Sequence, residues 1–431
     1  MRLEISSVTV LRQDDDLVMG CHLDGPKTGS VDAYVFEVHG WVVSTAEVVV
    51  VEFVHERGVM ASVEPRVPRP DVAKKYAIPS AAGFWKVIGT VGLAPEFTLT
   101  VRVVFADGRN REIALISGRI RLRSAFTPSM QPLMLTSLGR SGSTWLMRML
   151  AEHPSVLVHE RYPYEARVCS YWMHFIKVLA EPAGLTASVD FYEDVTKLAQ
   201  FPFSFMSPAK HAHPREQVAV DRWYAGSHVE ELAAMAQNAA ESFYREYATA
   251  RGRSTVAYFA EKSAPAGHCA WTIWQLYPQA KEIFLFRDPR DILASALAFN
   301  AKRGFPSFGR QHVGTDEEFI EVVRADLMSL VSRWKHRSSR GALLRYEDLV
   351  RSPQAALREM LDTFALDSSA VVVNSMVQAG NEVTAEVDRH RTSPDGQSSV
   401  GRWVKDLEPR LQSMCNDAFR GLLDEVGYGW P

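Results

Sequence analysis

"LTSLGRSGSTWLMRML", residues 135–150, leads from an apolar run through six small or polar residues into a segment with helical periodicity. If the apolar run is a strand of a parallel sheet, the loop after it lies at the strand's carboxyl end, beside a helix N-terminus. Such termini bind anions, and this loop adds N–H donors from Ser141 to Thr144, two glycines and the permanent cation of Arg140. A structural turn between a strand and a helix uses the same small residues, so the stretch alone leaves both interpretations open.

Residues 132–431 alternate short apolar runs with helix-length segments. Such runs are typical of strands that are buried on both faces of a parallel sheet and joined by right-handed crossovers. We therefore expect an α/β fold, a P-loop-like parallel sheet flanked by helices. The expected strands are "PLMLTS", "SVLVHE", "TVAYFAEK", "KEIFLFRD" and "ALLRYEDL".

Residues 1–124 have a different pattern, rich in β-branched and aromatic residues between turn signals. Short strands without a long helix between them predict an all-β, sandwich-like domain with antiparallel strands. The proline-rich segment 64–80 is expected to be a long connection across it. The polar stretch 123–132 marks a boundary, which gives an accessory domain 1–124 and a second domain 132–431.

Composition limits the classes of protein that fit. A formal net charge of −3 and a sequence pI near 6.5 provide no basic field for nucleic acid. The four cysteines are far apart without a CxxC pair, so we expect neither a disulfide framework nor a zinc site, and we assign no other metal site. The first residues do not resemble a secretory signal, and the most apolar segment, 41–54, is too short and too polar for a membrane span. These features favour a cytoplasmic protein without a membrane span.

A second candidate anion site lies in "EIFLFRDPRDILASALAFN", residues 282–300. The expected strand ends at Arg287, and Pro289 can begin the next helix because no backbone N–H is needed there. If the helix begins near Arg290, Ser295 lies between one and two turns in, where it and Arg287 could contact one phosphate. An arginine at a strand end beside an exposed serine is the alternative interpretation.

Together, "GRSGSTWL" and "FRDPRDILAS" resemble the two donor-binding motifs of the sulfotransferase superfamily, whose sulfuryl donor is 3′-phosphoadenosine 5′-phosphosulfate (PAPS). The first is similar to the 5′-phosphosulfate loop in the arginine version more familiar from carbohydrate sulfotransferases. The second is similar to the 3′-phosphate motif. Further similarity lies in "AEKSAP", "LRYEDLVRSP" and "GRW", in the same order within residues 132–429, and leaves the first 124 residues unexplained.

The resemblance implies transfer of a sulfuryl group from PAPS to an acceptor hydroxyl, with adenosine 3′,5′-bisphosphate (PAP) as the product nucleotide. The arginine loop favours a carbohydrate or glycolipid acceptor, and a small natural-product alcohol or phenol is the alternative. The donor-binding residues that the resemblance implies are Arg140, Ser141, Gly142, Ser143, Thr144, Trp145, Arg287, Ser295, Gly401, Arg402 and Trp403.

Sulfuryl transfer builds negative charge on the bridging oxygen of the leaving phosphate, and Arg140 is the expected cation there. The acceptor hydroxyl needs a base, and "SVLVHERYPYEAR" supplies His159, Glu160 and Glu165. Glu160 is the first choice, since the carbohydrate enzymes that the motifs resemble tend to have a glutamate at this strand end; a structural ion pair with Arg161 or Arg167 is its alternative role. Lys262, at another strand end, is expected to help hold the sulfuryl group or the acceptor.

Two functions of other classes remain open at this stage. A P-loop kinase would use ATP and Mg²⁺, but the lysine of the G-x-x-x-x-G-K-[ST] pattern is missing from residues 139–144. A non-catalytic binding protein would retain the nucleotide fold without needing candidate bases beside it. Binding of PAPS with slow hydrolysis, hydrolysis of ATP, or neither, would separate the three.

Overall fold

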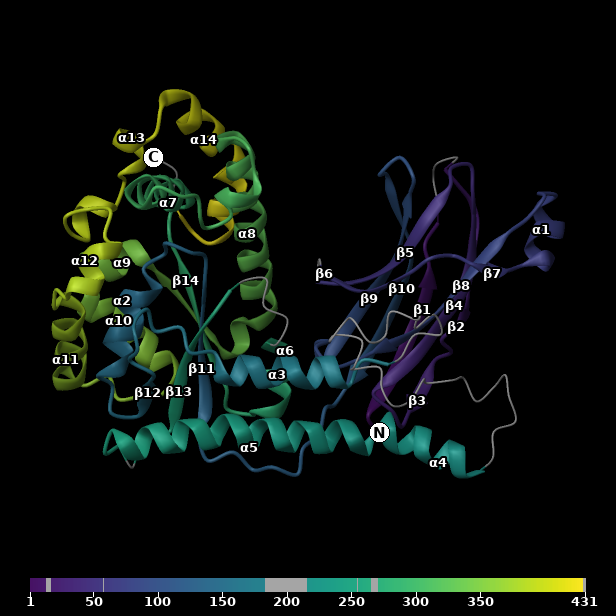
Figure 1. Ribbon diagram of the computed structural model, residues 1–431, viewed down its shortest axis with the longest axis horizontal. Helices are drawn as coiled ribbons and strands as arrows, with labels where there is room; N and C mark the ends of the chain where they lie inside the picture. Colours follow the sequence, from purple (N-terminus) through teal and green to yellow (C-terminus); the bar gives the residue numbers. More distant parts are fainter. Residues whose placement is uncertain (13–16, 57, 183–214, 254, 265–269, 429–431) are drawn as a thin grey trace. The chain divides into compact units, whose positions relative to one another are not determined.

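The computed structural model describes residues 1–12, 17–56, 58–182, 215–253, 255–264 and 270–428 (Figure 1). Cys269, one of the four cysteines, lies outside these described residues. The chain divides into two compact units. The β unit comprises Met1–Thr127, Tyr171–Ala239 and His268–Pro278, and the α/β unit comprises Pro128–Ser170, Ala240–Gly267 and Gln279–Pro431. The chain first changes unit after residue 127, within the expected linker, and the division into domains 1–124 and 132–431 stays a prediction.

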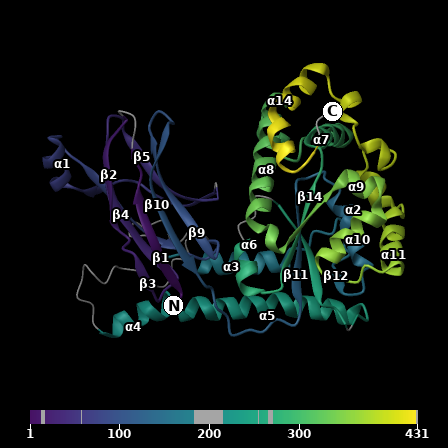
Figure 2. The ribbon, with the colours of Figure 1, turned by 180° about the vertical axis from the view of Figure 1, so that it is seen from behind.

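The described strands of the β unit are β1 (Leu3–Val10), β2 (Val18–Gly25), β3 (Gly29–Val31), β4 (Val35–Ser44), β5 (Val48–His55), β6 (Gly58–Val63), β7 (Val67–Pro68), β8 (Ala82–Gly89), β9 (Glu96–Phe105) and β10 (Asn110–Ile120). They form two antiparallel sheets, ordered β3-β1-β10-β9-β5-β6 and β2-β4-β8-β7 (Figure 2). Phe53 of the first sheet meets Phe84 of the second at 6.4 Å between ring centroids, and Phe97 meets Phe36 at 6.3 Å. The predicted sandwich-like arrangement of antiparallel strands in residues 1–124 is therefore confirmed.

The proline-rich segment 64–80 has more regular structure than a plain connection. It contains β7 and a short helix, α1 (Pro70–Tyr76), whose first position is a proline, where no backbone N–H is needed. Val72 on this helix is buried against Trp41. A seven-residue helix with one buried apolar position has almost no periodic signal, which is why the sequence did not predict it.

The α/β unit is built around a five-stranded parallel sheet with the order β12-β13-β11-β14-β15. These strands coincide with the five expected apolar runs, and all residues of the central β11 are buried, so the predicted α/β fold is confirmed. Their bounds are β11 (Gln131–Ser137), β12 (Val156–Val158), β13 (Tyr258–Ser263), β14 (Lys281–Phe286) and β15 (Gly341–Arg345).

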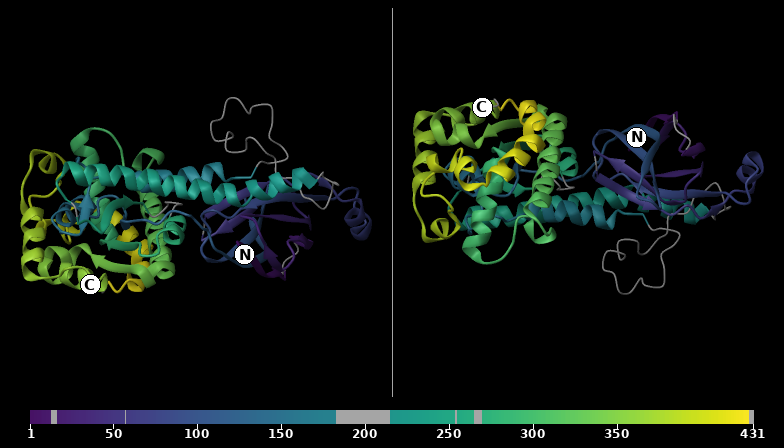
Figure 3. Two further views of the ribbon diagram at one scale, coloured as in Figure 1. Left: turned by 90° about the horizontal axis from the view of Figure 1, so that it is seen from below. Right: turned by 90° about the horizontal axis from the view of Figure 1, so that it is seen from above.

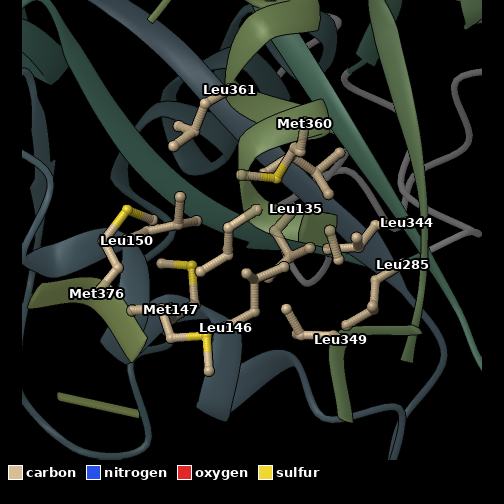
Figure 4. Packing of buried hydrophobic residues seen from close by; sticks show 14 of the residues in the cluster. Leu135, Leu146, Met147, Leu150, Leu285, Leu344, Leu349, Met360, Leu361 and Met376 are labelled. Carbon is tan, nitrogen blue, oxygen red and sulfur yellow. The ribbon is translucent and has the colours of Figure 1, made fainter. Parts of the chain in front are cut away.

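Helices cover both faces of the parallel sheet, as alternate residues of β14 show. Ile283 and Leu285 belong to a cluster with Leu146 and Leu150 of α2 (Figure 4), whereas Phe284 and Phe286 belong to a second cluster with α7, α8 and α14. On the second face α14 packs along α8 (Figure 3). The described helices of this unit are α2 (Ser143–Ala151), α7 (Pro289–Arg303), α8 (Asp316–Arg337), α9 (Tyr346–Arg351), α10 (Pro353–Thr363), α11 (Ala370–Asn381), α12 (Ala385–His390), α13 (Trp403–Asp406) and α14 (Pro409–Glu425).

Four further helices lie wholly or partly in the β unit, and two of them contribute residues to both units. They are α3 (Val168–Leu179), α4 (Arg215–Tyr224), α5 (Ser227–Ala250) and α6 (Ala270–Leu276). In the β unit, Gln275 of α6 donates to the Leu93 carbonyl oxygen at 3.0 Å, and Arg2 of the segment before β1 pairs with Glu230 of α5 at 2.9 Å. Segments that follow the linker in sequence therefore complete the β unit.

Candidate active site

The loop after β11 begins helix α2 at the carboxyl edge of the sheet. Gly142 precedes the helix with φ 87°, a left-handed conformation that favours glycine. A Cβ at this position would lie 2.6 Å from the ring of Tyr346, so the loop also needs glycine for space. Ser141 is buried and, among the described residues, its hydroxyl has no hydrogen-bond partner. The strand, loop and helix arrangement predicted for an anion site is present.

The guanidinium of Arg140 turns from the loop towards α7. Its Nε donates to Ser295 Oγ at 3.1 Å, and one Nη donates to the His390 carbonyl oxygen at 3.0 Å. The same group lies over the Phe299 ring, 4.6 Å from its centroid. Burial, followed by repulsion from Arg287 and Arg402, lowers the pKa of Arg140 to about 10. A buried cation next to two other cations is a site where an anion would bind favourably.

Arg287 contributes a second guanidinium from the end of β14. It donates to the carbonyl oxygens of Arg140 at 2.8 Å and Ser399 at 2.7 Å, and it lies over the Tyr346 ring at 4.3 Å. Its Nε is buried and has no hydrogen-bond partner among the described residues. The structure thus brings Arg287 and Ser295 to one site with Arg140, as the two motifs predicted.

Arg402 adds the third guanidinium from the C-terminal segment. Its Nη1 donates to Thr392 Oγ1 at 2.7 Å, and that hydroxyl is 3.2 Å from Ser295 Oγ. Asp406 pairs with Arg402 at 2.6 Å. We call Arg140, Arg287, Arg402, Ser295 and Thr392 the arginine cluster. Thr392 was not singled out from the sequence, because a hydroxyl in an irregular segment has no motif that marks it.

A second cationic centre lies at the start of α2. Lys262, at the carboxyl end of β13, donates from Nζ to Thr144 Oγ1 at 2.7 Å and to the Pro163 carbonyl oxygen at 2.6 Å. Glu165 lies 3.6 Å from the same nitrogen. Burial is the largest cause that lowers the pKa of Lys262, to about 8. The ammonium therefore faces the loop with its charge largely retained at neutral pH.

Both centres face one cavity of about 660 Å³ in the α/β unit. Its walls come from the loop after β11, from α2, from the ends of β13 and β14, and from α7, α9, α11 and the segment after α12. The predicted site residues that line it are Arg140, Gly142, Ser143, Thr144, Trp145, Lys262, Arg287, Ser295 and Arg402.

Other predicted residues are not among the described residues that line the cavity. Glu160 pairs with Arg251 at 2.6 Å, and the His159 ring packs on Tyr247 with 4.9 Å between centroids. The first-choice base, Glu160, is thus in a structural ion pair, but its partner is Arg251, the residue that follows α5, and not one of the two arginines expected from the sequence. After β12 ends at Val158, these two side chains contact Tyr247 of α5 and Arg251, the residue that follows α5, whereas Glu165 lies in the cavity wall.

Gly401 and Trp403 also serve a structural purpose. Their backbone N–H groups donate to the carboxylate of Asp291, at 2.7 and 3.0 Å, and the Trp403 ring stacks on Arg290 with 4.1 Å to its centroid. Neither residue is part of the lining as the described chain defines it, whereas Arg402 between them is. The "GRW" motif therefore presents one side chain to the cavity.

No group of three or more His, Cys, Asp or Glu residues within the described ranges could hold a metal ion. No helix in the described part of the chain is long and apolar enough to cross a membrane.

The fold and the loop define a P-loop-like α/β protein, and comparison with known proteins gives the family. The protein-family model described as "Sulfotransferase family" matches residues 132–369. The chain therefore belongs to the sulfotransferase family, as its motifs suggested. Carbohydrate sulfotransferase 1 of Danio rerio is 28% identical over 160 residues, which cover 34% of this chain and 38% of that protein. The match thus spans well under half of that relative.

Solved sulfotransferase structures are also similar. The sulfotransferase domain from the Synechococcus PCC 7002 olefin synthase has a TM-score of 0.40 and 16% identity, and covers 72% of this chain and 99% of that domain. Mouse sulfotransferase SULT7A1 complexed with PAP has a TM-score of 0.38 and 13% identity, and covers 69% of this chain and 86% of that one.

Proposed function

We propose that this protein transfers a sulfuryl group from PAPS to an acceptor hydroxyl and releases PAP. The observation that carries the proposal is the presence of two cationic centres in one cavity: the arginine cluster and the Lys262–Thr144 pair at the start of α2. PAPS has two anionic ends, a 3′-phosphate and a 5′-phosphosulfate, which such a cavity would bind together.

The arginine cluster is the proposed site of the 3′-phosphate. Its hydroxyls on Ser295 and Thr392 and its guanidiniums can all donate to phosphate oxygens. The loop N–H groups of 141–144 and the ammonium of Lys262 then face the phosphosulfate at the helix N-terminus. Arg140 was expected at the phosphosulfate; its backbone lies in that loop, but its guanidinium contacts Ser295, so we assign the guanidinium to the 3′-phosphate.

Glu165 is the proposed base. It lines the cavity 3.6 Å from Lys262, and its side chain is half exposed, so an acceptor hydroxyl can reach it. The carboxylate takes the hydroxyl proton as the acceptor oxygen forms a bond to sulfur and the bond from sulfur to the bridging phosphate oxygen breaks. Lys262 and the loop N–H groups stabilise the charge left on the phosphate.

A carbohydrate or glycolipid hydroxyl is the proposed acceptor, since the matching curated relative is by name a carbohydrate sulfotransferase. A small natural-product alcohol or phenol is the alternative. Screening both classes with labelled PAPS and the full chain separates them by which product acquires the label.

Calorimetric titration with PAP tests the donor assignment directly. We expect saturable binding without added metal and no hydrolysis of ATP with Mg²⁺. Hydrolysis of ATP without PAP binding would point to a kinase-like nucleotide site instead, and binding of neither nucleotide would contradict the donor site.

A further inference from the structure

Asp291 is not among the described residues that line the cavity. Asp291 is in the first turn of α7 and is fully buried. One of its oxygens accepts from the Gly401 N–H at 2.7 Å and the other from the Trp403 N–H at 3.0 Å. The carboxylate therefore binds two residues of the C-terminal segment, Gly401 and Trp403, which have one residue between them.

The residue between these two amides is Arg402, whose guanidinium reaches Thr392 in the arginine cluster. Gly401 has φ 71°, and Arg402 follows this turn into the cavity wall. Because the amides on both sides of Arg402 are held in place, the position of its Cα and the direction of its Cα–Cβ bond are set as well. Asp291 is in this way connected to the cavity through Arg402.

Asp291 is not needed to begin α7. The N-cap is Asp288, whose side chain accepts from the Arg290 N–H at 2.9 Å. Burying a carboxylate costs free energy, and burial raises the pKa of Asp291 to about 6. The amides of Gly401 and Trp403 and the charge of Arg287 lower this pKa, but less than burial raises it. The carboxylate accepts its hydrogen bonds from those two amides, which offset part of the cost of its burial.

We propose that Asp291 is a positioning residue of the donor site, which orients Arg402 for the 3′-phosphate by binding the amides of Gly401 and Trp403. The proposal rests on the proposed function, because it takes the arginine cluster as the donor's phosphate site. It adds a residue from outside the cavity that sets donor affinity.

A double-mutant cycle in the full chain tests this connection. Asp291→Asn turns one acceptor oxygen into an N–H group that opposes a backbone N–H, and we expect PAP to bind on the order of tenfold more weakly. Arg402→Ala should weaken binding by about 10–100-fold. If Asp291 acts through Arg402, the double variant binds PAP no more weakly than Arg402→Ala alone, within roughly twofold. The proposal would be overturned if the double variant loses PAP affinity by the product of the two single losses, or if Asp291→Asn binds PAP like wild type.

Glu241→Gln is the matched control for general destabilisation. Glu241 of α5 is a buried carboxylate that accepts from the Ser129 N–H at 2.9 Å and from its hydroxyl, and it is not part of the lining as described. We expect this variant to have a lower Tm and unchanged PAP affinity. Weakened binding here would show that destabilisation alone accounts for the Asp291 effect, and would overturn the proposal.

Gly401→Ala keeps the test decisive if Asp291→Asn does not fold. A Cβ at 401 would meet no atom within 4 Å, so the change acts through the strained left-handed backbone and not through a clash. We expect PAP affinity to fall several-fold, and to fall no further when Arg402→Ala is added. An unchanged affinity would overturn the positioning role. If Arg402→Ala and Arg140→Ala both bind PAP like wild type, the donor site itself is wrong; if they lose affinity while Asp291→Asn and Gly401→Ala do not, only this inference is wrong.

Discussion

At the scale of single residues, two guanidiniums of the arginine cluster, those of Arg140 and Arg287, have no carboxylate within ion-pair distance among the residues that the structure describes. Arg402 has Asp406 beside it, but Arg140 and Arg287 donate mainly to backbone carbonyl and hydroxyl oxygens. The lowered pKa of Arg140 reflects burial and this repulsion. Such a cluster is more favourable with a dianion bound than without one.

Arg140→Ala and Arg287→Ala should therefore each weaken donor binding while the fold remains. Loss of one charge-assisted contact to a phosphate costs about 1.5–3 kcal/mol, or roughly 10–150-fold in Kd for PAP. Calorimetry measures the affinity and circular dichroism the fold. Arg324→Ala, which removes an exposed arginine of α8 paired with Glu321, is the control and should bind PAP normally. Wild-type affinity in either cluster variant would remove that residue from the site.

We expect Lys262 to make donor affinity depend on pH. Since its pKa is lowered to about 8, the ammonium loses its proton as pH rises through 8, and PAP binding should weaken between pH 8 and 9. Lys262→Met should bind more weakly at pH 7 and lack this descending limb. The same limb in Lys262→Met would assign the titration to another group.

The same lysine predicts a stability change of opposite sign in the free protein. In the unfolded state the lysine keeps its proton up to its ordinary pKa of 10.5, whereas in the folded state its pKa is lowered to about 8. The unfolded state therefore binds more protons between pH 8 and 10.5, and the contribution of this group to stability rises with pH in that window. Urea denaturation of wild type and Lys262→Met at both ends of the window would measure the difference.

The base is testable by separating affinity from rate. Glu165→Gln should keep PAP affinity within a few-fold and lower turnover by about 10²–10⁴, because an amide cannot take the acceptor proton. Glu160→Gln should affect turnover much less, since Glu160 is paired with Arg251 and lies outside the described lining. A dead Glu160→Gln with an active Glu165→Gln would restore the choice made from the sequence, and a dead His159→Ala would assign the base to the histidine.

At the scale of elements, strong periodic patterns were enough for prediction and weak ones were not. The five strands of the parallel sheet were predictable because each is a continuous apolar run, and the two cationic motifs because they follow β11 and β14 directly. Which of the three candidate bases faces the cavity was harder to predict, because β12 has three residues and the side chains of His159 and Glu160 contact Tyr247 and Arg251, which are distant in sequence. Thr392 and Asp291 form hydrogen bonds with residues of other segments, Arg402 and Gly401, so no local sequence pattern could mark either residue.

One buried ion pair joins elements of the α/β core and should be important for stability. Arg337 at the end of α8 pairs with Glu282 of β14 at 2.7 Å, and both side chains are nearly inaccessible. Thr136 of β11 donates to the same carboxylate at 2.5 Å. Arg337→Met leaves a buried carboxylate without its cation, so we expect a loss of about 3–5 kcal/mol in the free energy of unfolding.

Urea denaturation measures this loss, with Arg324→Ala as the control. The exposed pair between Arg324 and Glu321 contributes little, so its removal should cost less than about 1 kcal/mol. A cost for Arg337→Met as small as that of the control would mean that the core reorganises around Glu282, and that the pair does not join these elements.

At the scale of the whole molecule, the two units have different sequence patterns but are not two continuous segments. The β unit takes in 171–239 and 268–278, which follow the linker. A linker marked by proline and polar residues predicts where the chain first leaves a unit, and says nothing of whether it returns. Helices α4 and α6 look in sequence like any other helices between sheet strands, so their place in the β unit could not be predicted.

Deletion of residues 1–124 tests whether donor binding requires the N-terminal part of the β unit. All the described residues that line the cavity belong to the α/β unit, so the shortened chain should bind PAP with an affinity close to that of the full chain. Its Tm should fall, because Trp271 of α6 loses its hydrogen bond to Glu56 and Gln275 loses the Leu93 carbonyl. Calorimetry with PAP and thermal unfolding measure the two effects, with full-length Arg140→Ala as a folded control that binds weakly. A shortened chain that is folded by circular dichroism and does not bind PAP would show that the β unit is required for the donor site.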